Sequence, residues 1–156
     1  MKQCIVLGLL ALCFIACGEK GNDIEQVAKK YSKDILSGNI EQIAKNARMP
    51  DGQALDSEQI ANFIKERKYL SQEYRLLAKQ SGGLKETMVS NTQCLERLPE
   101  EKLGNICVVY LDLLFSDSAR VPMAVPLVEV EKKWYPVFDA SAYPSDESPN
   151  IAPKGD

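Results

Sequence analysis

Apolar residues recur every three or four positions along the first half of the chain, which is the spacing that gathers them on one face of an α-helix. The first stripe predicts a helix over residues 24–37, with a cap at Asn22 or Asp23 before it and Gly38 at its end. A second, shorter helix is predicted after an N-cap at Asn39. The two stripes consist of Ile24, Val27, Ala28, Tyr31 and Ile35, and then of Ile40, Ile43, Ala44 and Ala47.

A third helix is predicted to begin at Asp56 or Ser57, after a turn over residues 49–52. Its apolar face changes phase midway, so we expect a bend or break between Lys68 and Ser71. Ser81-Gly82-Gly83 is expected to end the helical half of the chain. The apolar positions are Ile60, Phe63 and Ile64 before the change of phase, and Leu70, Tyr74 and Leu77 after it.

The second half of the chain is typical of β-strands. Residues 84–98 are compatible with a first strand, and residues 105–116 carry the strongest strand pattern in the chain. This second strand is apolar on both faces, which indicates a central position in its sheet. A loop of hairpin length, residues 99–104, lies between the two.

A third strand over residues 119–131 contains Pro122 and Pro126. Because proline cannot donate to a strand ladder, these residues favour a sheet edge or a bulge. Lys132-Lys133 predicts a turn, and residues 134–138 predict a fourth strand. About three helices followed by four meandering strands predict an α+β domain, with the helices packed on one face of an antiparallel sheet.

The N-terminal residues have a different character. Lys2 precedes an apolar stretch from Cys4 to Ile15, which is shorter than the roughly 20 residues that a membrane-spanning helix needs. A positive charge, a short apolar run and small residues are typical of a secretory signal peptide, here residues 1–16. The segment Phe14-Ile15-Ala16-Cys17-Gly18 resembles the lipobox of bacterial lipoproteins. An ordinary signal peptide with an incidental cysteine is the alternative.

The lipobox resemblance implies that Cys17 becomes the first residue of the mature chain. Its thiol would carry diacylglycerol and its amine a fatty acid such as palmitate, and two or three acyl chains hold a protein firmly at a bilayer. Gly18 stands where an aspartate favours the inner membrane of enteric bacteria, so the resemblance favours the outer membrane and leaves the periplasmic or surface face open. Residues 17–22 would be a short tether.

Five cysteines are present. Cys4 and Cys13 would leave with the leader and Cys17 would be lipidated, so Cys94 and Cys107 remain as a pair in an oxidising compartment. We predict a structural disulfide between them, on facing strands near the loop. A zinc site would need four ligands, and a redox pair would have closer spacing, so both alternatives are weaker.

The order of elements resembles the cystatin-like, nuclear transport factor 2-like cone, and in particular small bacterial lipoproteins of unknown function built on that plan. The resemblance rests on the Gly38-Asn39 step between the first two helices and on a last strand that opens with Trp134. It would cover residues 23–139 as a single domain. The C-terminal residues 140–156, with three prolines and many small polar residues, would form a disordered tail.

The composition narrows the possible chemistry. The 156 residues include no histidine and carry a formal net charge of −3, so a histidine base is excluded and nucleic acid is not expected as a partner. No phosphate-binding glycine motif, cofactor signature or metal-ligand cluster is apparent, and we expect no enzyme. Asp112 and Tyr110 share a strand face and would suit a steroid isomerase-like pair. The simpler interpretation leaves Asp112 in solvent and Tyr110 packed at an edge.

Two groups of residues are candidates for binding. The aromatic residues Trp134 and Tyr135, with Tyr110 and Asp112, are candidates for a pocket, although Trp134 would equally suit the core. The acidic residues near the bridged loop are candidates for a partner surface, namely Glu96, Glu100 and Glu101. We therefore expect a membrane-anchored envelope lipoprotein that acts by binding an envelope protein. The alternative is a carrier of a small ligand on the concave face of the cone.

Overall fold

The computed structural model describes residues 23–95 and 104–138, and it contains three helices followed by four strands. The helices are α1 (Ile24–Ser37), α2 (Ile40–Asn46) and α3 (Ser57–Gln80). Asp23 caps the start of α1, because its carboxylate accepts a hydrogen bond from the Glu25 amide at 3.2 Å. Gly38 caps the other end, with a φ of 77° that is the left-handed conformation glycine adopts without strain. The predicted limits of α1 are confirmed. α3 begins with a capping box between Asp56 and Gln59.

The predicted break in α3 is wrong, because the helix is continuous from Ser57 to Gln80. The two positions that interrupt the apolar stripe are polar residues that nevertheless face inward. The guanidinium of Arg67 lies over the ring of Phe63 at 5.2 Å, and buried Ser71 donates its hydroxyl to the Ile35 carbonyl of α1 at 2.6 Å. The Ser71 hydroxyl is thus paired inside the domain, whereas the buried Nε atom of Arg67 has no hydrogen-bond partner among the described residues and the guanidinium is held by the Phe63 ring.

The strands are β1 (Leu84–Cys94), β2 (Asn105–Phe115), β3 (Arg120–Val130) and β4 (Lys133–Pro136). They form one antiparallel sheet in the order β1-β2-β3-β4, so β2 lies inside the sheet as predicted. The last turn is made by Glu131 and Lys132, with φ of 51° and 63°, whereas Lys133 is the first residue of β4. The predicted turn at Lys132-Lys133 is therefore displaced by one residue.

The prolines of β3 lie where the strand has a free side. β4 pairs only with Leu127–Val130, so the preceding part of β3 is an edge. At this edge, the Pro126 carbonyl accepts a hydrogen bond from the Val137 amide at 3.1 Å, and the Pro122 carbonyl accepts one from the Tyr74 hydroxyl at 2.9 Å. Because proline has no N–H, it leaves no unpaired donor at a sheet edge.

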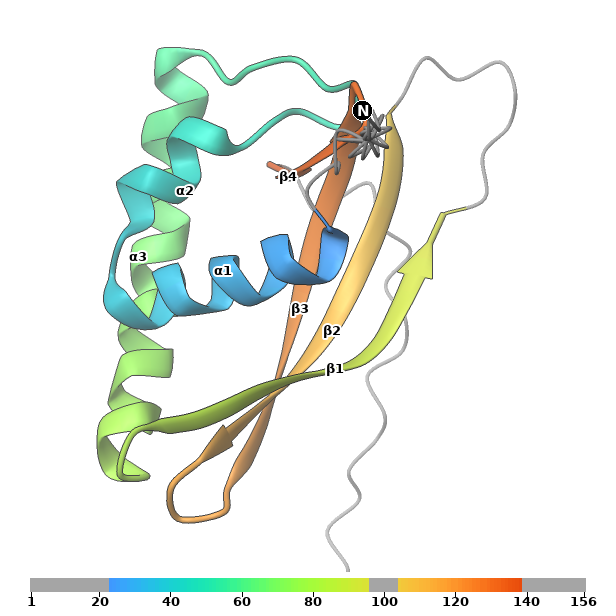
Figure 1. Cartoon of the computed structure of the whole chain (residues 1–156). Coiled ribbons are helices and arrows are strands. Elements are labelled where there is room, and N and C mark those ends of the chain that lie inside the picture. The colour runs from blue at the N-terminus through green and yellow to red at the C-terminus, as the bar shows by residue number, and fades with distance from the viewer. Residues whose placement is uncertain (1–22, 96–103, 139–156) are drawn as a thin grey trace, which may run out of the picture.

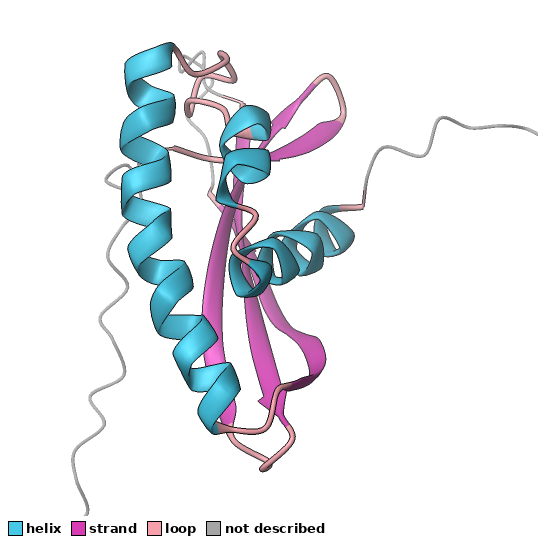
Figure 2. Ribbon diagram, turned by 90° about the vertical axis from the view of Figure 1, so that its left-hand side faces the viewer, coloured by secondary structure: helices cyan, strands magenta, loops and turns pink. Residues whose placement is uncertain are grey.

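The three helices cover one face of the twisted sheet (Figure 1). α3 runs along the sheet, and α1 crosses it at a steep angle (Figure 2). Between them lies the hydrophobic core, to which β2 contributes alternate residues with no exposed surface: Val109, Leu111, Leu113 and Phe115. Among the described residues no helix lies on the opposite face of the sheet. The predicted fold class, an α+β domain with helices on one face of a four-stranded antiparallel meander, is confirmed.

Cys94 and Cys107 form a disulfide and are direct partners in the β1–β2 register, as predicted. Cys107 is buried, whereas Cys94 is exposed at the end of the outer strand. No helix in the described ranges is long and apolar enough to cross a membrane. The predicted signal peptide, Cys17, tether and tail lie outside the described residues, as do Glu96, Glu100 and Glu101.

Replacing both Cys94 and Cys107 with alanine is expected to lower the free energy of unfolding by roughly 3 kcal/mol. The bridge spans a sequence separation of 13 residues, and cutting it restores entropy to the unfolded chain. Urea unfolding of the variant and of the oxidised wild type measures the difference. Reduced wild type serves as the matched control, because it loses the bridge without losing the side chains. Equal stabilities would show that the disulfide does not restrain the unfolded chain.

Candidate functional site

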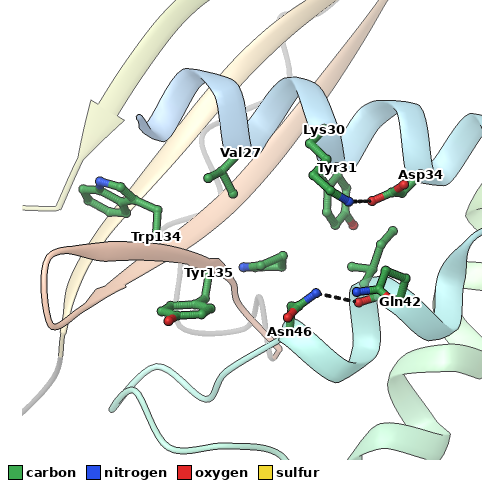
Figure 3. Close-up of a pocket in the computed structure, with 10 residues that line it drawn as sticks. Val27, Lys30, Tyr31, Asp34, Gln42, Asn46, Trp134 and Tyr135 are labelled. Carbon is green, nitrogen blue, oxygen red and sulfur yellow. Dashed lines mark hydrogen bonds and ion pairs between the residues drawn. The ribbon is translucent and has the colours of Figure 1, made fainter. Parts of the chain in front are cut away.

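A cleft of about 240 Å³ opens where α1, α2 and β4 meet (Figure 3). We call it the aromatic cleft, because the rings of Trp134 and Tyr135 stand on its β4 side. Its floor consists of the buried residues Tyr31, Ile43 and Pro136. The remaining lining residues are Val27, Lys30, Asp34, Gln42 and Asn46.

Helical spacing explains how α1 supplies one wall. Its lining residues follow Val27 by three, four and seven positions, so all four lie on one face of the helix. They are Val27, Lys30, Tyr31 and Asp34. Gln42 and Asn46 of α2 are likewise four positions apart. The cleft is therefore built on regular elements, which hold side chains more rigidly than loops do.

β4 is fastened to the segment that follows α2. The Arg48 amide donates to the Pro136 carbonyl at 2.8 Å, and the Phe138 amide donates to the Arg48 carbonyl at 2.9 Å. The Arg48 guanidinium lies over the ring of Tyr135, 4.6 Å from its centroid, and donates to the Ala47 carbonyl at 2.9 Å. These contacts fix the aromatic wall against α2, and Arg48 acts as a positioning residue for Tyr135.

The rim of the cleft is polar and carries both donors and acceptors. Lys30 and Asp34 form an ion pair at 2.6 Å one helical turn apart. The Asn46 amide nitrogen donates to the Gln42 carbonyl at 3.0 Å, which leaves the side-chain oxygen of Asn46 available. Exposed side-chain amides next to apolar walls are well suited to hydrogen-bond the backbone of an extended peptide.

Tyr31 carries the cleft's most deeply buried titratable group. Burial raises the pKa of its phenol above the ordinary value of 10.0, and the positive charge of Arg67 opposes this rise. Burial also raises the pKa of half-buried Tyr74, with a further contribution from the nearby phenol of Tyr31. Both phenols are neutral at physiological pH. Tyr31 in the cleft and Tyr74 on α3 therefore act as apolar rings whose hydroxyl groups can form hydrogen bonds.

The structure brings together only part of the predicted pocket. Trp134 and Tyr135 line the cleft, but Tyr110 and Asp112 lie on the opposite face of the sheet from the helices. This grouping was wrong because side chains alternate along a strand, and the neighbouring residues Val109 and Leu111 fill the core. The Tyr110 hydroxyl donates to Gln93 of β1 at 3.4 Å, so Tyr110 packs across two strands from the inner strand β2, and not at a sheet edge as the simpler interpretation expected.

Sequence reasoning missed the polar rim. Lys30, Gln42 and Asn46 have the appearance of ordinary solvent-exposed helix residues, and Asp34 of a surface ion-pair partner. Their only shared signal was that they flank the apolar stripes of two successive helices, which many surface residues do. In the part of the chain that the structure describes, no group of three or more metal-ligating side chains is present.

Neither the family models nor the curated proteins searched give a match to this chain. Among solved structures, the fold is similar to that of a protein from Campylobacter jejuni that is named as a candidate NTF2-like transpeptidase. The likeness has a TM-score of 0.57 and 18% sequence identity, and it covers 74% of this chain and 97% of the other. Identity at this level shows the fold alone, which is the NTF2-like cone.

Tyr31→Phe is expected to weaken the pH dependence of stability at alkaline pH. The unfolded phenol loses its proton near pH 10.0, whereas the folded one keeps it to a higher pH. The stability that the neutral phenol contributes is therefore fully present below pH 10.0. It is lost as the pH rises from there through the higher pKa of the folded state, at up to about 1.4 kcal/mol per pH unit. Urea unfolding between about pH 8 and pH 11 should show a shallower decline for the variant. Identical declines would mean that Tyr31 ionises equally in both states.

Proposed function

We propose that this protein is a lipid-anchored envelope lipoprotein that acts by binding another protein, and that the aromatic cleft receives the partner's anchoring side chain. The observation that carries the proposal is the size and construction of the cleft. A volume of about 240 Å³, rigid aromatic walls and a polar rim suit one or two side chains of a partner. Tyrosine and tryptophan are the residues most enriched at such positions in interfaces.

The interior of the cone supports this proposal over a carrier function. Ligand carriers enclose pockets of about 300–1,000 Å³ that bury most of the ligand. Here the space between helices and sheet is filled by fully buried side chains, with Phe63 of α3 and Phe115 of β2 the largest. A small-ligand carrier remains the second candidate, and the aromatic walls of the cleft are the observation that favours it.

The transpeptidase name of the structural neighbour prompts comparison with the residues of this chain. Acyl transfer uses a nucleophile that an adjacent base activates, most often histidine or lysine. This chain has no histidine, and the two cysteines in its described part are joined in a disulfide. The cleft holds a lysine, Lys30, but its amine is paired with Asp34. These residues favour a binding role in our proposal.

The lipid anchor of the proposal rests on the leader sequence and on Cys17. We expect Cys17→Ser to move the protein from the membrane fraction to the soluble envelope fraction, because acyl chains supply roughly 0.8 kcal/mol per buried methylene. Fractionation of cells and a mass measurement of the N-terminal peptide test this expectation. Cys13→Ser, within the leader, is the matched control and should leave the protein in the membrane. A C17S protein that remains membrane-bound after leader removal would refute the anchor.

The cleft itself is tested by photo-crosslinking of the full chain in its own cells. A benzophenone amino acid at Gln42, which is exposed and lines the cleft, should give an adduct with a single envelope protein. Trp134→Ala in the same chain should reduce that adduct about thirtyfold, the effect of losing about 2 kcal/mol at a hot spot. Urea unfolding checks that the W134A domain is still folded.

Leu76→Ala is the control for this experiment, since Leu76 is an apolar residue of α3 with 57% of its surface exposed. Its truncation removes apolar surface away from the cleft and should leave the adduct unchanged. An adduct that survives W134A, or one that L76A reduces equally, would contradict a role for the cleft. Retention of a small molecule by the purified protein, lost in W134A, would favour the carrier instead.

A further inference from the structure

The two margins of the sheet differ in how far they are protected from pairing with another strand. The part of β3 that does not pair with β4 carries Pro122 and Pro126, and their carbonyls already accept hydrogen bonds from Tyr74 and Val137. β1, at the other margin, pairs only with β2 among the described strands. From residue 87 to residue 95 it has no proline, no glycine and no charged side chain. Proteins commonly protect exposed edges with charges or prolines, and this stretch has neither.

The backbone of β1 presents hydrogen-bonding groups to its free side. The Leu95 amide donates to the Ile106 carbonyl of β2 at 2.9 Å. Because backbone groups alternate between the two sides of a strand, those of Cys94 and Thr92 point away from β2. The Thr92 amide already donates to the side-chain oxygen of Asn91 at 2.8 Å, whereas the Thr92 carbonyl and both backbone groups of Cys94 face the free side. Nearby, the hydroxyl oxygen of Thr87 is buried and has no hydrogen-bond partner in the described part of the chain. Within residues 23–95 and 104–138, this margin therefore holds polar groups without a hydrogen-bond partner.

An open groove of about 600 Å³ follows this margin, with Glu86–Thr92 on one side and α1 on the other. α1 contributes Glu25 and Lys29, one negative and one positive residue a helical turn apart. On the β1 side the groove has one further charge, Glu86, and the lining residues after it, 87–92, are uncharged. A β1 edge that meets its own copy beyond residue 86 therefore brings no like charges of the two strands together, which fits an isologous contact.

We propose that the free edge of β1 pairs antiparallel with β1 of a second copy of this chain, which joins the two sheets across a two-fold axis. The centre of the contact lies after the register shift between Val89 and Asn91, in the regular segment that ends at Cys94. The Cys94 amide would then donate to the Thr92 carbonyl of the second copy, and the Thr92 amide would exchange its bond to Asn91 for one to the Cys94 carbonyl of that copy. This inference does not depend on the aromatic cleft or on its partner.

The test again uses the full chain in its own cells. A benzophenone amino acid at exposed Gln93 should crosslink two copies, recognised by twice the mass and by peptides of this chain alone. Asn91→Lys in the same chain adds a lysine of each copy to this short contact, opposite Leu95 of the other copy, where charge on an otherwise uncharged edge opposes pairing. It should reduce the homodimer adduct at least about tenfold. Asn91 is exposed, so this change leaves the core intact.

Ala124→Lys is the matched control, because Ala124 is exposed on β3, away from this margin, and the same charge there should leave the adduct unchanged. Three results would overturn the proposal. They are the absence of a homodimer adduct from Gln93, equal loss of the adduct in N91K and A124K, and an adduct whose second component is a different protein. The last result would show that the edge binds a foreign strand.

Discussion

The inner face of β2 carries four side chains without any exposed surface, Val109, Leu111, Leu113 and Phe115, and the positions of the helices follow from the need to cover them. α1 crosses this face with Ile35 and Ala28 fully buried, and α3 closes it with Phe63. An antiparallel sheet can leave its other face in water, so three helices on one side are sufficient. Filling the cone in this way packs fully buried side chains of the helices directly against those of the sheet.

The aromatic cleft is a consequence of how the shortest strand is held. β4 has four residues and pairs only with the end of β3, so its stability depends on a second attachment. The segment after α2 provides this attachment through the backbone of Arg48. Its amide donates to the Pro136 carbonyl, and its carbonyl accepts a hydrogen bond from the Phe138 amide. β4 thereby stands beside α1 and α2 without being covered by them, and its two aromatic rings form the wall of a cleft.

Periodicity in the sequence was sufficient to predict the helices, the central position of β2 and the edge character of Pro122. The pairing of Cys94 with Cys107 was predictable from the oxidising compartment that the leader implies and from their positions on facing strands near the loop. The continuity of α3 was missed because Arg67 and Ser71 are polar residues at inward positions, and periodicity assigns polar residues to solvent. The cleft was predicted only on its β4 side, since Lys30, Gln42 and Tyr135 come together through tertiary packing that no local pattern records.

α1 separates the two surfaces that we propose for binding. Its Val27, Lys30, Tyr31 and Asp34 line the aromatic cleft, whereas Glu25 and Lys29 face the groove beside β1. The sheet order places β1 and β4 at opposite margins, so a second copy bound at β1 leaves the cleft open to a partner. Any energetic coupling between the two would have to pass through α1, whose position is fixed by the buried contact of Ser71 with Ile35. A rigid helix held in this way favours independent binding at the two surfaces.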